Sequence, residues 1–202
     1  MDCLRFKTRS RVLITVELQP EPDDFDSLVK KPGQDFLSKV PRPRGKQWKN
    51  KDFWCDVIPY MMEAYNSICA YSSLWIKPDQ PTIDHYISRD EDPKQAYEWE
   101  NFRLARWRIN TSKRNHKDVL DPFIIGENWF ELDFTTFGIK PNPKLDENER
   151  NAIWKTIELL KLDNKDYRDA RAEWFDAFRN DISKLEKKAP FVAYEMKRQG
   201  IN

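Results

Sequence analysis

Apolar residues recur at helical spacing between residues 53 and 68. Five of the apolar residues in this segment form one stripe: Val57, Met61, Ala64, Tyr65 and Ile68. An α-helix brings residues spaced three or four apart onto one face, so the pattern predicts an amphipathic helix that buries this face in the core.

A different pattern follows, with short runs rich in β-branched and aromatic residues. We expect strands at 74–76, 82–87 and 101–105, with a charged, proline-containing loop between the last two. The residues from 106 to 116 are predicted to form a short helix. The resulting order over 82–116 is strand, loop, strand, helix.

Strict alternation marks another strand nearer the C-terminus. Phe130, Leu132 and Phe134 alternate with Glu131 and Asp133, which indicates a strand with one buried and one solvated face. We expect it to pair with Ile124 and Ile125 across a turn at 126–128. The sequence Pro-Asn-Pro at 141–143 is expected to break the chain after this hairpin.

The C-terminal third reads as helical. Asp146 with Glu149 three residues later is typical of a capping box, and Ile153, Ile157 and Leu160 continue it at helical spacing. A second helix is predicted to start after Asn164. Its apolar stripe consists of Tyr167, Ala170, Trp174, Phe178, Ile182 and Leu185. A last short helix is expected over 189–198, ending at Gly200.

Residues 1–52 are expected to be mostly irregular, apart from a short strand at 12–16 and a turn at Pro32–Gly33. The predicted fold class is α+β. Its parts are an N-terminal wrapping arm (1–52), a central core (53–137) with a ββα arrangement, a preceding helix and a following hairpin, and a C-terminal helical region (138–202). The three parts are expected to form one compact unit.

Composition adds a strongly solvated surface and a soluble setting. The chain has 202 residues, of which 39% are apolar and 34% charged, and its eight Trp supply buried area that the aliphatic residues do not. Three cysteines are too few for a disulfide framework, and neither a signal peptide nor a membrane span is visible. We therefore expect a cytoplasmic protein without a membrane partner.

The formal net charge of +1 hides two basic segments without acidic residues, 38–51 and 101–117. Each is either a solvated face or a surface that holds phosphates. In the second segment the candidate nucleic-acid-binding residues are Arg103, Arg106, Lys113 and Arg114.

Asp84 and His85 are the residues that suggest chemistry. A neutral imidazole can take a proton from water, and a carboxylate is a ligand suited to Mg²⁺ or Mn²⁺. Neighbouring residues of a strand point to opposite faces, so the two side chains are expected to act separately, one on water and one on a metal. A strand histidine considered alone is more often a structural residue than a catalytic one.

Two asparagines extend this site. Asn110, on the predicted helix, is a neutral second metal ligand, and Lys113 lies one turn further on the same face. Asn101 either orients the His85 ring or holds its loop. His116, six residues past Asn110, is expected to be a helix-end residue.

In this order and spacing, Asp84-His85, Asn101 and Asn110-x-x-Lys113 resemble the HNH endonucleases of the His-Me finger (ββα-metal) superfamily. The segments 96–105 and 118–123 are similar to a bacterial subgroup, several members of which belong to phage-defence and mobile-element systems. The resemblance implies that His85 is the general base, that Asp84 and Asn110 bind the metal, and that Asn101 orients the base.

One departure concerns the structural zinc that braces many relatives through two C-x-x-C pairs. The matching positions here are Cys69, Ser72, Arg106 and Ile109. A single thiolate cannot build such a site, so we expect no structural zinc. Bracing is expected instead from Trp75, Trp99, Trp107 and the helix at 53–68.

The leading hypothesis is therefore a Mg²⁺- or Mn²⁺-dependent HNH endonuclease that hydrolyses phosphodiester bonds in DNA, in the setting of bacterial anti-phage defence. One alternative is an inactive HNH-fold module that binds nucleic acid or protein. Another is a nuclease subunit that is active only with a partner such as an ATPase, or as a homo-oligomer. The sequence leaves open whether the substrate is DNA or RNA, and whether cleavage produces a nick or a double-strand break.

Overall fold

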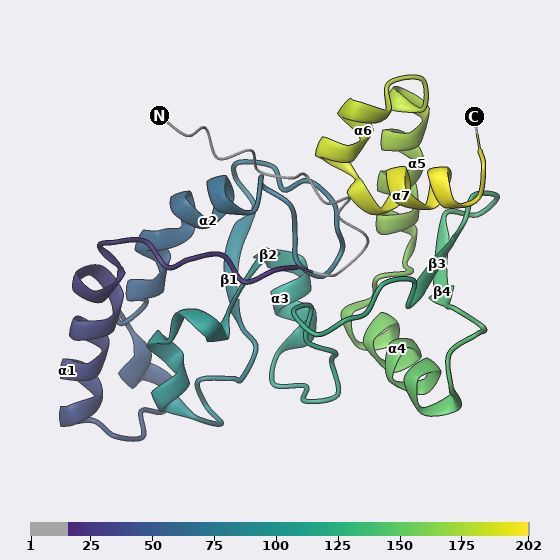
Figure 1. The fold of residues 1–202 in the computed structure, drawn as a ribbon. Coiled ribbons are helices and arrows are strands. Elements are labelled where there is room, and N and C mark those ends of the chain that lie inside the picture. The colour runs from purple at the N-terminus through teal and green to yellow at the C-terminus, as the bar shows by residue number, and fades with distance from the viewer. Residues whose placement is uncertain (1–15, 202) are drawn as a thin grey trace, which may run out of the picture.

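The computed structural model describes residues 16–201 (Figure 1). In this range seven α-helices and two small antiparallel sheets form a mixed α/β fold. The predicted strand at 12–16 lies outside the described residues except for Val16. Buried side chains from Phe25 to Met196 belong to one hydrophobic cluster. No helix in residues 16–201 combines the length and apolarity that crossing a bilayer requires.

The N-terminal region is less irregular than predicted. A π-helical turn at Asp26–Lys30 continues directly into α1 (Lys31–Lys39). Pro32 falls in the first turn of α1, where a proline is tolerated, so Pro32–Gly33 forms no separate turn. A Cβ atom built on Gly33 would lie 2.2 Å from Cγ of Tyr97, because the helix backbone packs directly on that ring.

The predicted helix at 53–68 is present but shorter. A 3₁₀ turn at Phe53–Val57 leads into α2 (Ile58–Ala64). Of the predicted stripe, Val57, Met61 and Tyr65 are buried, whereas Ala64 and Ile68 are half-buried. Asn66 and Ser67 then adopt positive φ angles, which end the helix. The predicted strand at 74–76 is reduced to a single bridge between Trp75 and Ile68.

The predicted order of strand, loop, strand and helix over 82–116 is confirmed with small shifts in the boundaries. Strand β1 (Pro81–His85) pairs antiparallel with β2 (Phe102–Arg106), placing His85 opposite Phe102. Helix α3 (Trp107–Lys113) follows immediately and packs on both strands. The β1–β2 connection contains two 3₁₀ turns, Pro93–Tyr97 and Trp99–Asn101.

In the second sheet, the predicted strand pairs with a different segment from the one expected. Strand β3 (Phe130–Asp133) pairs with β4 (Gly138–Pro141), not with Ile124 and Ile125. The Asp133 side chain accepts hydrogen bonds from the Thr135 N–H and the Thr136 hydroxyl, which fixes the turn after β3. Ile124 is 69% exposed, outside both sheets.

The C-terminal region is helical as predicted, with one extra break. Helix α4 (Glu147–Leu160) begins with the expected capping box of Asp146 and Glu149. The predicted second helix is divided into α5 (Lys165–Phe178) and α6 (Ile182–Lys188), because Asp181 caps a new N-terminus. Helix α7 (Pro190–Arg198) confirms the last helix.

Candidate functional site

Asp84 is buried between the first sheet and helix α3, with only 1% of its surface exposed. Its Oδ2 atom accepts a hydrogen bond of 2.5 Å from the Tyr71 hydroxyl and lies 3.2 Å from Nζ of Lys113. No hydrogen bond reaches Oδ1 from the described residues. Burial raises the pKa of Asp84, and the positive charge of Lys113 acts in the opposite direction.

Lys113 is held as tightly as Asp84. Its ammonium group donates to the backbone oxygens of His85 (2.8 Å) and Tyr86 (3.0 Å) in addition to its ion pair with Asp84. These three contacts match the three N–H groups of the ammonium, and the side chain is 1% exposed. The predicted contact of Lys113 with a nucleic acid does not fit this environment. Lys113 instead fastens the end of α3 to the end of β1.

The His85 ring packs among aromatic side chains on the other face of β1. Its ring meets the edges of Trp54, at a centroid distance of 4.5 Å, and Phe102, at 5.4 Å. Nε2 lies 3.0 Å from the Ala96 carbonyl oxygen. A carbonyl oxygen only accepts hydrogen bonds, so Nε2 carries the proton and Nδ1 keeps its lone pair.

The charge state of His85 follows from its surroundings. Burial lowers the pKa of His85 to about 4, and the positive charges of Arg89 and Lys113 act in the same direction. The ring is therefore neutral near pH 7, with a lone pair on Nδ1. Arg89 lies over the rings of Trp48 and Trp54, next to this face.

Asn101 holds the loop rather than the His85 ring. Its side chain accepts a hydrogen bond from the Ile87 N–H (2.7 Å) and donates to the carbonyl oxygens of Ile87 and Gln95, both at 2.9 Å. Gln95 precedes Ala96, whose carbonyl holds the imidazole. Of the two roles considered for Asn101, the structure shows loop fixation, through which the residue acts on His85 indirectly.

Asn110 reaches from α3 to the strand that carries Asp84. Its Nδ2 donates to Oγ1 of Thr82 (3.3 Å) and to the Ile83 carbonyl (3.2 Å). The Oδ1 atom accepts no hydrogen bond from the described residues. Asp84 and Asn110 therefore each present an oxygen without a hydrogen bond.

Two such oxygens suit a hard divalent cation that keeps most of its ligands as water or phosphate oxygens. A carboxylate and an amide oxygen are ligands that a Mg²⁺- or Mn²⁺-type ion accepts, but the positive charge of Lys113 weakens the attraction of Asp84 for a cation. In residues 16–201 no three His, Cys, Asp or Glu side chains gather into a ligand set.

The three predicted nucleic-acid-binding arginines differ in availability. Arg103 is 3% exposed, forms a two-pronged ion pair with Asp121 and stacks 3.6 Å from the ring centroid of Phe123, so it is unavailable to a phosphate. Arg106 donates to the Trp75 carbonyl oxygen (2.6 Å). Arg114 is exposed just after α3, with a φ of 47°, and is free to reach a ligand.

Three of the four positions that the resemblance matches to zinc ligands are buried. Cys69 is a buried free thiol and Ile109 is 0% exposed. Trp75 packs against Trp174 at a centroid distance of 6.3 Å and Trp99 is buried, as expected. The prediction that Trp107 braces the core is wrong, because its side chain is 49% exposed.

Several residues of the site were missed by sequence reasoning. Tyr71 and Trp54 contact Asp84 and His85 from segments with no motif, and Arg89 sits in a charged loop. The Ala96 contact uses a backbone oxygen, which leaves no residue-type signal.

Comparison with known proteins found no match: no family model matches the sequence, and no curated protein does.

Proposed function

We propose that this chain is a metal-dependent endonuclease of the HNH type that hydrolyses phosphodiester bonds in DNA. One observation supports this most strongly. The His85 imidazole is neutral and carries its proton on the nitrogen that contacts Ala96, and within residues 16–201 no hydrogen bond is made to its other nitrogen. This is the state that a general base needs before it acts.

In the proposed reaction, Nδ1 of His85 takes a proton from the attacking water, and Asn101 keeps the loop carrying Ala96 in place. Asp84 and Asn110 would hold one divalent metal ion with their free oxygens. When bound, this ion supplies positive charge next to the phosphate oxygens and the leaving oxygen. Tyr71 and Lys113 fix the carboxylate of Asp84 in one orientation.

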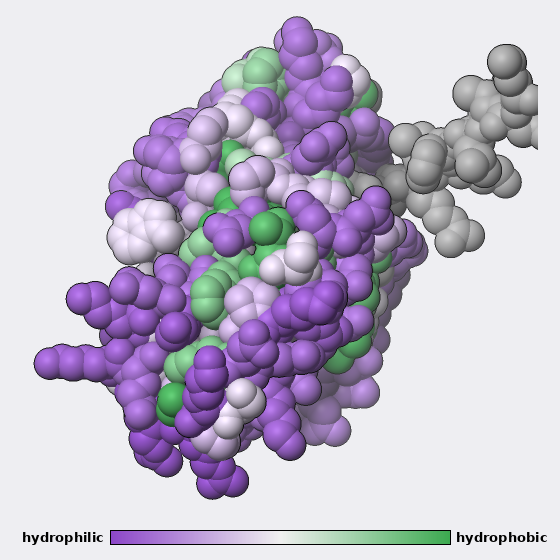
Figure 2. All heavy atoms as spheres, turned by 90° about the vertical axis from the view of Figure 1, so that its left-hand side faces the viewer, coloured by the Kyte–Doolittle hydropathy of each residue, from purple (hydrophilic) through white to green (hydrophobic). Residues whose placement is uncertain are grey.

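Positive side chains around His85 suit a phosphate backbone. The Trp48 ring lies 6.5 Å from the Trp54 ring, which in turn lies 4.5 Å from His85. Trp48 belongs to the basic segment 38–51, so these two contacts bring the segment close to the candidate base. Lys46 and Lys49 of the same segment are exposed. The face of the molecule that carries α1 is predominantly hydrophilic, with an apolar band across its middle (Figure 2). The exposed Lys46 and Lys49 favour phosphate binding by this segment.

The test is cleavage of supercoiled plasmid by purified wild type and His85→Ala with Mg²⁺, with Mn²⁺ and with EDTA. We expect metal-dependent nicking or linearisation by wild type and none by the variant. His116→Ala is the matched control, because His116 is exposed and has no contact with His85. Equal cleavage by His85→Ala and wild type would exclude the mechanism.

The Lys113–Asp84 ion pair favours a second candidate, an inactive HNH-fold module that binds nucleic acid or protein. In this alternative the buried ammonium takes the place of a metal ion beside Asp84. Calorimetric titration with Mn²⁺ separates the two. A binding signal that is lost in Asp84→Asn supports the nuclease, and the absence of a signal in wild type supports the module.

A third possibility is a nuclease that acts only in a complex, with an ATPase partner or with a second copy of the chain. Plasmid cleavage that stays absent in the purified protein, together with Mn²⁺ binding at Asp84, would point to this possibility. A size on gel filtration that grows with protein concentration would indicate self-association.

A further inference from the structure

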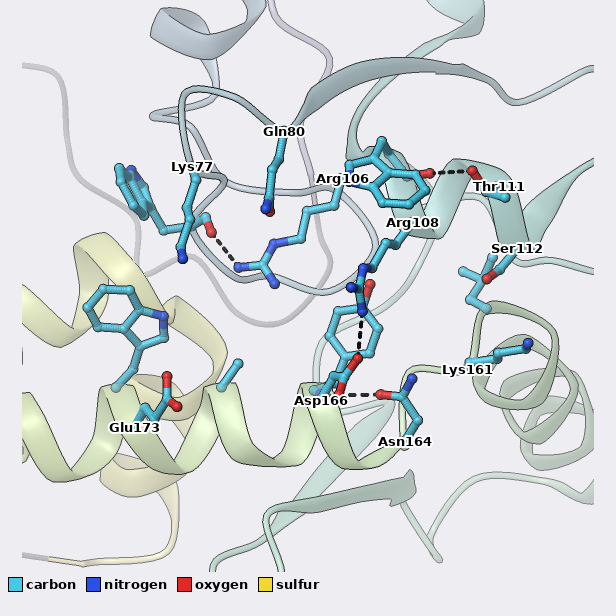
Figure 3. A pocket seen from close by; sticks show the side chains of 16 residues that line it. Lys77, Gln80, Arg106, Arg108, Thr111, Ser112, Lys161, Asn164, Asp166 and Glu173 are labelled. Atoms are coloured by element: carbon cyan, nitrogen blue, oxygen red, sulfur yellow. Dashed lines mark hydrogen bonds and ion pairs between the residues drawn. The ribbon is translucent and has the colours of Figure 1, made fainter.

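A cavity of about 540 Å³ lies between the ββα unit and the C-terminal helices, away from Asp84 and His85. Figure 3 shows Lys77, Gln80 and Arg106 on one side of it and the side chains of α5, among them Asp166 and Glu173, on the opposite side. The volume is in the range of small-molecule sites in proteins. The proposed nuclease mechanism makes no use of this cavity.

Aromatic side chains form part of its lining. Trp107 is 49% exposed, although tryptophan is rarely left in water without a reason. Trp75 and Trp174 meet edge to face, and Nζ of Lys188 lies 3.4 Å from the Trp75 ring centroid. The cavity thus offers flat π surfaces, one of which is open to solvent.

The remaining lining is charged, with an excess of positive groups. Lys77 and Lys161 line the cavity and form no ion pair within the described part of the chain. Arg106 also lines it, and its Nε atom is buried without a hydrogen-bond partner. Such an unsatisfied donor is uncommon in proteins and marks a place where a polar partner is missing.

The two acidic groups of the lining differ. Asp166 is neutralised by Arg108, whose NH1 atom lies 2.6 Å from its carboxylate. Glu173 has no such partner within residues 16–201. A free carboxylate among cations selects a ligand that carries hydrogen-bond donors as well as negative charge.

We propose that this cavity binds a nucleotide. The base stacks on Trp107, the phosphate is held by Lys77 and Arg106, which lie side by side in Figure 3, and Glu173 accepts a hydrogen bond from an exocyclic amine or a ribose hydroxyl. Aromatic rings, cations and one free carboxylate together match a base, a phosphate and a sugar. The nucleotide is either free or part of a nucleic-acid strand, and both sources present the same chemistry.

Isothermal titration calorimetry of the full chain tests the proposal with AMP, adenosine, inorganic phosphate and the oligonucleotide dA6. We expect AMP to bind more tightly than adenosine or phosphate alone. Trp107→Ala is expected to weaken binding about tenfold, the effect typical of a lost base–aromatic stack. Lys77→Gln is expected to weaken the binding of AMP and dA6 but not that of adenosine.

The chain offers matched controls for both variants. Trp154 is 48% exposed on α4 and lies outside the cavity, as does the exposed Lys155. Trp154→Ala and Lys155→Gln should bind like wild type. The readout is binding and not cleavage, so failure of the nuclease proposal would leave this result unchanged. Binding of AMP indicates a free nucleotide, and binding of dA6 alone indicates a strand. Binding of neither, or equal losses in Trp107→Ala and Trp154→Ala, would overturn the proposal.

Discussion

Nζ of Lys113 lies 3.2 Å from Oδ2 of Asp84, and neither side chain has more than 2% of its surface exposed. A lysine of a basic segment, expected on the surface, is thus part of the buried frame of the site. Removing one partner of such a pair leaves a charge in a low-dielectric interior, which costs far more than losing a surface contact.

Lys113→Met is therefore expected to lower the free energy of unfolding by about 3–5 kcal/mol, measured by urea denaturation. Lys117→Met is the control, because Lys117 pairs with Glu91 at the surface, where a salt bridge contributes about 0–1 kcal/mol. A similar, small loss in both variants would mean that Lys113 is not buried with Asp84.

His85 should make stability depend on pH. Its pKa is about 4 in the folded protein and near 6.5 in the unfolded chain. Between these values the unfolded state binds the proton more tightly, so acidification from pH 6.5 to 4 should remove about 3 kcal/mol of stability. Urea denaturation at several pH values should show this component in wild type but not in His85→Phe.

Gly33→Ala should destabilise the protein although alanine is the better helix former. In an exposed helix the change gains about 1 kcal/mol, but here the new methyl group would collide with the Tyr97 ring. We expect a net loss of about 1–3 kcal/mol in thermal or urea denaturation. Ser38→Ala, on an exposed position of the same helix, should change stability by less than about 0.5 kcal/mol.

Substitution of Arg103 should lower stability, whereas substitution of Arg114 should weaken DNA binding. Arg103→Gln removes the ion pair with Asp121 and should cost about 3–5 kcal/mol of stability. Arg114→Gln should leave stability unchanged, weaken DNA binding, and reduce the slope of log affinity against log salt concentration by about 1. An unchanged salt slope for Arg114→Gln would remove this residue from the proposed phosphate contacts.

The local parts of the fold were predictable from sequence, because periodicity and capping act over a few residues. The order β1, β2, α3 and the capping box at Asp146 belong to this group. The pairing of β3 with β4 was not predictable in the same way, since the turn that selects the partner depends on the Asp133 side chain. Helix α1 was missed because Pro32 and Gly33 usually interrupt helices.

The candidate site was predictable only as a set of residue types. Asp84, His85, Asn101 and Asn110 were found from their order and spacing, but the direction of each side chain depends on contacts from distant segments. The buried state of Lys113 requires backbone oxygens at the end of β1 that no residue type reveals. The same holds for the proton position on His85, which the Ala96 carbonyl determines.

The close approach of Gly33 to Tyr97 limits how the ββα unit can be moved to another protein. Tyr97 follows the residue whose carbonyl binds the His85 ring, and its own hydroxyl donates to the Lys51 carbonyl oxygen. A fragment that begins at residue 53 would lose Gly33 and Lys51, both of which contact Tyr97. A transplanted ββα unit would therefore have to begin before α1, and a chimaera that joins at residue 52 should fold with a displaced histidine.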